Sequence, residues 1–201
     1  MCGRFYIDDE SSIEIKKILD QIDRKYQNKK KTTGEIFPTN EVPILASFKD
    51  KVEPELSIWG FPNYNNKGVL INARAETALE KKTFREGVIS RRCVIPSSGF
   101  FEWNRSKQKY YFQKQEEGIL YMAGIYNFYK DECRFVILTT AANVSMKDIH
   151  HRMPIVLEKE EVEKWILDQK ETSRILLKTP PLLTREITGK DIPEQLTLDL
   201  E

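Results

Sequence analysis

Short β-type runs make up most of the sequence between residues 42 and 140, and this pattern constrains the fold more than any other feature. Turn-rich segments such as 63–68 separate the runs, so each run predicts a short strand. Many strands with few helices in mixed order are typical of an α+β domain. We therefore expect one compact α+β domain with a β-rich mixed or antiparallel sheet core and a few peripheral helices. The expected strands are Arg4–Ile7, Val42–Phe48, Glu55–Trp59, Val69–Ile71, Arg92–Ile95, Phe100–Trp103, Lys109–Gln113, Ile119–Tyr126, Arg134–Thr140 and Pro154–Leu157, with a further one near Glu186.

Four helices are expected around these strands. Apolar residues from Ile15 recur at helical spacing and predict an amphipathic helix to about Tyr26, with Ser11 and Glu14 as a capping box. No repeat or linker divides the sequence, so we expect a single domain over residues 1–201. The other expected helices are Glu76–Gly87, Ser145–Ile149 and Glu160–Asp168.

Charge and cysteine content limit the classes of function. The 32 basic and 31 acidic side chains leave a net charge of +1, which gives no overall attraction to nucleic acid or anionic membrane. Any nucleic-acid site must therefore come from a local cluster of Arg and Lys. No apolar run is long enough to span a bilayer, and the N-terminus is unlike a secretory signal. The 3 cysteines form no CxxC pair, which favours a reducing cytoplasm and argues against a metal site. Cys93 and Cys133 lie in or at the start of predicted strands, so we expect both in the core.

Cys2, which we expect to be exposed near the N-terminus, is the first residue with distinctive chemistry. Removal of Met1, which is readily trimmed before a small residue, would leave an α-amine and a thiol on the same residue. Their reference pKa values, about 7.7–8.0 and about 8.5, leave both groups partly nucleophilic near neutral pH. An amine can condense with an aldehyde to an imine, and a neighbouring thiol can close on that carbon to give a thiazolidine. The simpler interpretation is an incidental cysteine at a frayed terminus.

Three further motifs carry polar side chains suited to assist such a nucleophile. Asn72 and Arg74 lie in a predicted strand-to-helix connection, where an amide can hold a polar group and a guanidinium can hold a phosphate. Glu102 lies between aromatic residues, which would make it a general acid if it is buried, although alternation alone favours a solvent-facing side chain. His150 and His151 are the only 2 histidines and precede a predicted strand. Each motif alone also fits an ordinary connection, strand or surface.

Taken together, these motifs resemble the SRAP family, the SOS response-associated peptidases or abasic-site processing proteins. The matching segments occur in the family's order and run from Cys2 to about Leu157, with a less distinctive C-terminal segment packed on that core. The resemblance implies a compact β-rich domain whose partner is single-stranded DNA containing abasic sites, acting in the SOS response and DNA repair. It implies no cofactor, no obligate protein partner, a monomer, and a cytoplasmic location that becomes nucleoid-associated on DNA damage. The segments are Met1–Phe5, Asn72–Thr77, Gly99–Trp103 and Ile149–Pro154.

The resemblance also implies individual roles. Cys2 would form a thiazolidine crosslink with the ring-opened abasic sugar, Asn72 would position its amine, and Glu102 would shuttle protons. His150, and not His151, would assist ring opening and release, and Arg4, Arg74 and Arg152 would hold phosphates. The family is credited with removing residues ahead of its cysteine by its own peptidase activity; here ordinary methionine removal suffices.

Two departures from the family pattern affect the expected DNA contacts. Position 151 is a histidine where many relatives carry an acidic residue. The loop after Trp59 lacks the tryptophans that many relatives use for base stacking, so Phe61 or Tyr64 would have to stack a base in their place.

Three other functions compete with this interpretation. One is an N-terminal-cysteine amidohydrolase of the glutamine amidotransferase type, although the early Arg-Gly and the Asn-Gly segments of that class are missing. Another is a cysteine peptidase that uses Cys2, His150 and Asn72. The third is a non-catalytic module that binds single-stranded DNA, whose DNA retention would survive the loss of Cys2.

Overall fold

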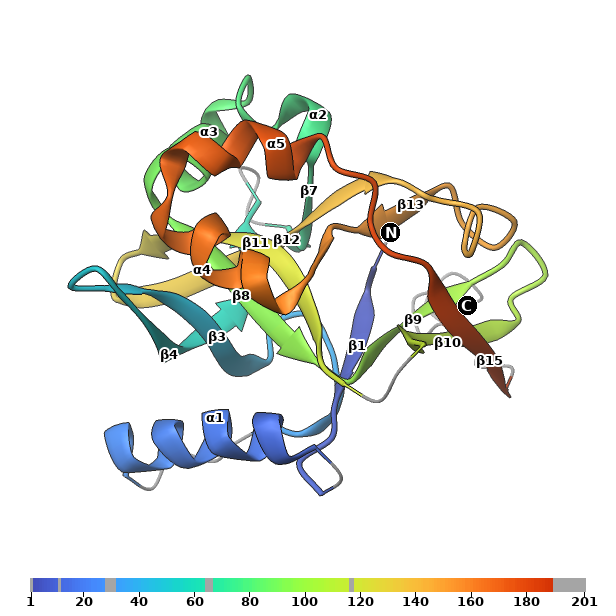
Figure 1. Ribbon diagram of the computed structural model, residues 1–201, viewed down its shortest axis with the longest axis horizontal. Coiled ribbons are helices and arrows are strands. Elements are labelled where there is room, and N and C mark those ends of the chain that lie inside the picture. The colour runs from blue at the N-terminus through green and yellow to red at the C-terminus, as the bar shows by residue number, and fades with distance from the viewer. Residues whose placement is uncertain (1, 11, 28–31, 64–66, 116–117, 190–201) are drawn as a thin grey trace.

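The computed structural model of the protein describes residues 2–10, 12–27, 32–63, 67–115 and 118–189. It confirms the expected α+β class with a sheet-rich core and few helices (Figure 1). Among the described residues, no helix is long and apolar enough to cross a membrane. The helices are α1 (Ile13–Lys25), α2 (Ala75–Ala78), α3 (Lys82–Ser90), α4 (Lys159–Leu167), the 3-10 turn η1 (Gln169–Glu171) and α5 (Thr172–Leu176).

The strands form two main sheets and a small hairpin. The five-stranded sheet has the order β15-β10-β9-β1-β2, so β1 lies inside it between β9 and β2. In the larger sheet, β12, β4, β3, β8 and β11 pair in a closed circuit, which leaves those strands arranged as a small barrel. The strands are β1 (Arg4–Ile7), β2 (Gly34–Ile36), β3 (Glu41–Phe48), β4 (Lys51–Trp59), β5 (Phe61–Pro62), β6 (Val69–Leu70), β7 (Asn72–Arg74), β8 (Arg92–Ser97), β9 (Gly99–Trp103), β10 (Lys109–Lys114), β11 (Leu120–Tyr129), β12 (Glu132–Ala141), β13 (Arg152–Pro154), β14 (Val156–Leu157) and β15 (Leu183–Gly189).

Aromatic side chains join the two sheets into one core. Phe5 of β1 contacts Trp59 of β4 with ring centroids 5.0 Å apart, and Trp59 stacks on Phe135 of β12 at 6.3 Å. All three side chains are fully buried. Because Phe5 is three residues from Cys2, this packing fixes where the N-terminal end of β1 enters the fold. Cys93 is buried as expected, whereas Cys133 keeps part of its surface exposed.

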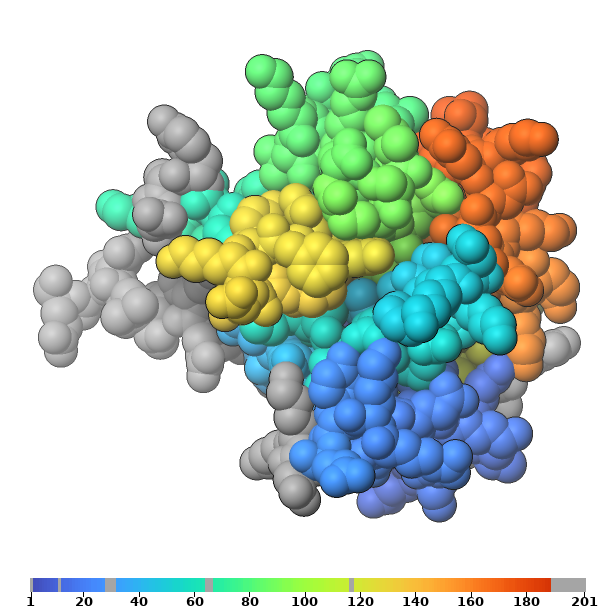
Figure 2. Space-filling view, turned by 90° about the vertical axis from the view of Figure 1, so that its left-hand side faces the viewer, coloured from blue at the N-terminus to red at the C-terminus, as the bar shows by residue number. Residues whose placement is uncertain are grey.

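The helices cover the barrel on several sides. Helix α1 lies below the barrel in Figure 1, and α2, α3 and α5 lie above it. On the left-hand side of the molecule, seen in Figure 2, α1 lies at the bottom, the β3–β4 and β11–β12 hairpins lie across the middle, and α3 lies above them. The β9–β10 turn lies on the right-hand side of Figure 1, away from those hairpins.

A buried arginine ties the C-terminal ends of α3 and α4 together. Arg92 donates from Nη1 to the carbonyl oxygens of Val88 and Ile89 at 3.0 and 2.5 Å. It also donates from Nε to the Trp165 carbonyl at 2.5 Å and from Nη2 to the Ile166 carbonyl at 3.3 Å. These carbonyls lie at or near helix ends, where they lack intrahelical donors, and a cation there also interacts favourably with the helix dipole.

Several predicted elements are wrong in detail. The expected Glu76–Gly87 helix is divided into α2 and α3 by the extended backbone of Lys81. Gly87 lies inside α3, where a Cβ would be only 3.0 Å from the Ile125 side chain. The N-cap of α1 is Ser12, whose side chain accepts from the Ile15 amide; Ser11 of the predicted capping box lies outside the described residues.

The region before β13 also differs from the expectation. Residues 145–149 form turns and not a helix. The Asn143 side chain accepts from the Ser145 amide and donates to the carbonyls of Pro180 and Pro181, which ties these turns to the C-terminal segment. This arrangement ends with a bond from the His150 amide to the Met146 carbonyl at 3.0 Å, which holds His150 two residues before β13.

Candidate functional site

Cys2 lies two residues before β1, which is an interior strand of the five-stranded sheet. The antiparallel pairing of Arg4 with Phe101 brings the start of β1 alongside the end of β9, which carries Glu102. The Asn72 side chain donates from Nδ2 to the Cys2 carbonyl oxygen at 2.9 Å. The Cys2 side chain is fully buried, so the expectation of an exposed thiol is wrong for the chain in this form.

The environment of Cys2 keeps its thiol protonated. Burial raises the pKa of the Cys2 thiol far above its usual range, and the Glu102 carboxylate raises it further. The Sγ atom lies 3.7 Å from the Arg4 carbonyl oxygen, to which it donates. A thiol in such surroundings is a poor resting nucleophile, since the thiolate is the reactive form.

Asn72 comes from β7, which runs parallel to β12 through the pairing of Asn72 with Ile137. The Trp59 indole donates to the carbonyl of Ile71 at 3.0 Å and so helps to hold the preceding residue. The Oδ1 atom of Asn72 is buried and accepts no hydrogen bond from the described residues. The amide therefore holds the Cys2 backbone through Nδ2 and offers an oxygen that can accept a donor beside residue 2.

Glu102 and His150 form the acid–base part of the site. Glu102 is 4% exposed, so the solvent-facing alternative for this side chain is wrong. Its Oε1 atom lies 3.9 Å from Nδ1 of His150. The backbone amide of Arg152 lies 3.0 Å from the same ring nitrogen; when Nδ1 accepts this bond, the proton of the neutral ring is on Nε2. The ring of His151 stacks on that of His150 at 4.5 Å.

Of the three predicted phosphate ligands, Arg74 is exposed and forms no ion pair with any described residue. Arg4 is held by Glu35 at 3.0 Å, and its guanidinium lies over the rings of Phe37 and Trp103 at 4.5 and 5.2 Å. Glu35, which the sequence did not single out, therefore neutralises part of the Arg4 charge.

Arg152 forms a bidentate ion pair within the fold, and its role as a phosphate ligand stays a prediction. It is 8% exposed, and its two terminal nitrogens bind the two oxygens of Glu76 at 2.6 and 2.8 Å. Nη2 also donates to the Thr139 carbonyl at 2.5 Å. The guanidinium thus joins the first turn of α2 to β12, with little surface left for a phosphate.

Of the two predicted stacking residues, Phe61 is not available to a base. Phe61 is fully buried against Tyr129 and Phe84, with ring centroids 5.3 and 6.2 Å away, so that prediction is wrong. Tyr64 lies outside the described residues. A partly exposed aromatic residue near the site is Phe37, at 39% exposure beside Arg4.

A family model described as SOS response associated peptidase (SRAP) matches residues 1–192.

The chain belongs to the SRAP family.

Relatives of this SRAP protein carry a common name. It is 35% identical over 193 residues to the Abasic site processing protein YoaM of Bacillus subtilis, a match that covers 86% of this chain and 82% of YoaM. It is 29% identical over 188 residues to the Abasic site processing protein YedK of Escherichia coli, covering 87% and 85% of the two chains. A crystal structure of a Bacteroides thetaiotaomicron protein has a TM-score of 0.76 at 27% identity and covers 94% of this chain and 93% of that one.

A hollow of about 560 Å³ opens beside the acid–base pair of this SRAP protein. Two turns form most of its wall, the one after β9 and the one before β13, and His150 is part of its lining. No sequence pattern pointed to this hollow, because its two walls are about forty residues apart in the chain. Its lining residues are Trp103, Asn104, Arg105, Ser106, Lys147, Asp148, Ile149, His150 and His151.

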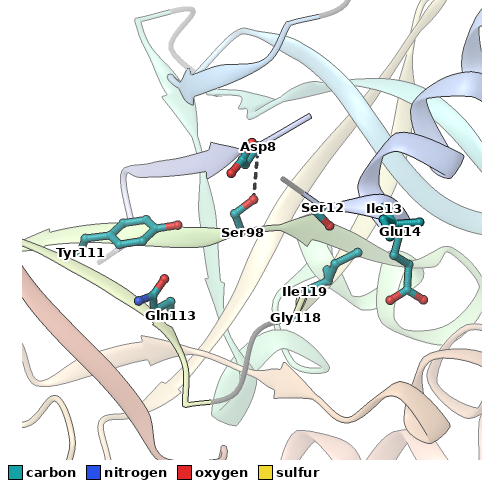
Figure 3. Close-up of a pocket in the computed structure, with 9 residues that line it drawn as sticks. All are labelled: Asp8, Ser12, Ile13, Glu14, Ser98, Tyr111, Gln113, Gly118 and Ile119. Carbon is teal, nitrogen blue, oxygen red and sulfur yellow. Dashed lines mark hydrogen bonds between the residues drawn. The ribbon is translucent and has the colours of Figure 1, made fainter. Parts of the chain in front are cut away.

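A second hollow, of about 550 Å³, lies beyond the other end of β1 (Figure 3). Its walls include Asp8, whose amide donates to the Ser98 hydroxyl at 2.9 Å, and the ring of Tyr111. The residues described in this wall include no cysteine, histidine or basic side chain, so it lacks the thiol and the imidazole found around Cys2. Across the described residues, no three His, Cys, Asp or Glu side chains are grouped as a metal site would require.

Proposed function

We propose that this SRAP protein captures abasic sites in single-stranded DNA through a covalent bond between mature Cys2 and the ring-opened deoxyribose. The observation that carries the proposal is that residues from four separated motifs, Cys2, Asn72, Glu102 and His150, meet around one end of β1. The names of the relatives YoaM and YedK, which are abasic site processing proteins, support the same substrate.

The reaction needs no oxidant and no cofactor. Removal of Met1, by ordinary methionine removal or by the protein's own peptidase activity, turns the Cys2 amide nitrogen into a free amine. The amine adds to the aldehyde carbon, and loss of one water gives an imine. The Sγ–H group then adds across the C=N bond, so that sulfur joins the carbon, the proton goes to the nitrogen, and a thiazolidine ring closes.

The surroundings of Cys2 favour this order of steps. The amine acts first because burial and Glu102 disfavour the thiolate. Glu102 then takes the thiol proton as sulfur attacks the imine carbon, and it returns a proton to the nitrogen. His150, at 3.9 Å from Glu102, exchanges protons with it and with the sugar oxygen during ring opening. Asn72 holds the Cys2 backbone in place through its 2.9 Å bond.

The same electrostatics argue against two rival activities. An amidohydrolase or a cysteine peptidase attacks a carbonyl with a thiolate, which is usually favoured by a lowered thiol pKa. At Cys2 both the burial and the neighbouring carboxylate act in the opposite direction. A non-catalytic DNA-binding module would leave no role for the buried Glu102 beside His150.

The test is a denaturing gel with protein that lacks Met1 and an oligonucleotide that contains one abasic site. We expect a shifted band with the wild type and none with Cys2→Ala, while Cys133→Ala, a matched cysteine control elsewhere, keeps the band. Borohydride should restore a band for Cys2→Ala, because its free amine still forms an imine that can be reduced. A heat-stable band from Cys2→Ala without borohydride would refute the thiazolidine, and ammonia released from glutamine would favour the amidohydrolase.

The acid–base roles predict a separate result. Glu102→Gln and His150→Ala should each slow crosslink formation or reversal by roughly 10²-fold or more, as expected for loss of a general acid–base group. Binding of an undamaged strand, followed by fluorescence anisotropy, should stay within about twofold of the wild type. An equal loss of binding and of rate would instead indicate that these side chains only hold the fold.

A further inference from the structure

The hollow beside His150 has the charge of an anion site. Arg105 and Lys147 are exposed on its rim, and neither forms an ion pair with any residue that the structure describes. Asp148 is the acidic residue of the lining, but Arg185 pairs with it at 2.6 Å and lowers the pKa of its carboxyl. The net charge of the lining is therefore positive.

The position of the hollow connects it to the reacting atoms. His151 belongs to the lining and stacks on His150, which in turn lies 3.9 Å from Glu102. A DNA strand whose abasic sugar is bound at Cys2 must run past the side chains that surround the site. The hollow directly adjoins His150, and its volume of about 560 Å³ is within the range of small-ligand sites, so it has room for a nucleotide.

Both walls of the hollow are held by local hydrogen bonds. In the turn after β9, the Asn104 side chain accepts from the amides of Ser106 and Gln108 at 2.9 and 3.0 Å. In the opposite turn, Asn143 accepts from the Ser145 amide at 3.0 Å. Arg105 and Lys147 therefore project from fixed turns, which lowers the entropy lost when they bind a ligand.

We propose that this hollow is a phosphate subsite that holds the DNA backbone on one side of the lesion through Arg105, Lys147 and His151. The inference rests on the proposed function, because a sugar bound at Cys2 places the adjoining backbone beside His150 and the hollow. It also gives the flanking strand a contact that does not depend on Phe61, whose side chain is fully buried. The recognised chemistry is the phosphodiester backbone, so binding through the hollow does not depend on base sequence.

The experiment combines a protein change with a substrate change. Three oligonucleotides each contain one abasic site, the first with nucleotides on both sides, the second without the 5′ flank and the third without the 3′ flank. Wild type, Arg105→Ala/Lys147→Ala and the charge-matched control Lys16→Ala/Lys17→Ala, on the exposed side of α1, are compared. The DNA concentration that gives half-maximal crosslinking is measured at several salt concentrations.

We expect the Arg105→Ala/Lys147→Ala variant to need roughly tenfold more of the two-flank DNA, with the same crosslinking rate at saturation. Its logarithmic salt dependence should fall by about 0.7 for each phosphate that the variant no longer neutralises. Against the substrate that lacks the flank held by the hollow, the variant and the wild type should be equal. An equal loss on all three substrates, a loss matched by Lys16→Ala/Lys17→Ala, or no loss would overturn the subsite.

The two proposals fail in different ways. If wild type forms no crosslink with any substrate, the proposed covalent function is wrong. Anisotropy with an undamaged single strand then still tests the hollow, since the same variant should bind more weakly and with a smaller salt dependence. Undiminished binding in that measurement would overturn the subsite by itself.

Discussion

Replacement of Arg152 by alanine tests whether this arginine stabilises the fold or binds DNA. The side chain makes a forked bond to Glu76 and donates to the Thr139 carbonyl at 2.5 Å. A hydrogen bond with a charged partner contributes about 1.5–3 kcal/mol, and Thr139 is fully buried, so we assign that range to its carbonyl. The Glu76 side chain is 47% exposed, and solvent screening reduces its pair to about 1 kcal/mol. We therefore expect a total loss of about 2.5–4 kcal/mol.

Urea unfolding followed by circular dichroism measures this loss directly. For m-values of about 2–3 kcal/mol/M, the midpoint of Arg152→Ala should fall by about 1–2 M. The salt dependence of DNA binding should stay as in the wild type. Arg74→Ala is the matched comparison and should do the reverse, with an unchanged midpoint and a salt dependence smaller by about 0.7. An unchanged midpoint for Arg152→Ala together with a reduced salt dependence would show that its guanidinium faces DNA and refute the reasoning.

Three other replacements or conditions give measurable results. Arg92→Met should lower the free energy of unfolding by roughly 3–5 kcal/mol, because four carbonyls at the ends of α3 and α4 lose their donor; an unchanged urea midpoint would contradict this. Phe61→Ala should cost about 3–5 kcal/mol as a core cavity and leave DNA affinity unchanged in anisotropy. Burial raises the pKa of the Cys93 thiol, so the folded state keeps a proton that the unfolded chain releases above a pH of about 8.5. The free energy of unfolding should therefore fall as pH rises above that value. Between pH 7 and 10, the urea midpoint of Cys93→Ala should fall by less than that of the wild type.

Features that depend on local sequence were predicted well. The strand Arg4–Ile7 has the expected bounds, and α4 differs from the expected helix by one residue at each end. Both follow from the periodicity of apolar residues, which is a property of neighbouring positions. The order of the strands could not be obtained in this way, because the closed circuit of the barrel depends on pairs such as β12 with β4 that are distant in sequence.

The errors at the site share one physical cause, which is packing between distant segments. Glu102 was weighed as a solvent-facing residue, yet it follows Phe100 by two positions and therefore shares its buried face. Phe61 was expected to be free for stacking, but Phe84 and Tyr129 cover it. The pairing of Arg152 with Glu76 from another motif was likewise not predicted. The identity of such partners is determined only by the tertiary fold.

The pairing of β1 has a consequence for the order of events during synthesis. Arg4 pairs with Phe101 of β9, so the burial of Cys2 cannot be completed until a strand almost one hundred residues later has left the ribosome. At about 5–20 residues per second, this delay lasts roughly 5–20 s. During that interval the nascent terminus remains accessible to enzymes that trim it. The terminus can thus be trimmed before the fold buries Cys2. The position of β9 in the chain determines how long this interval lasts.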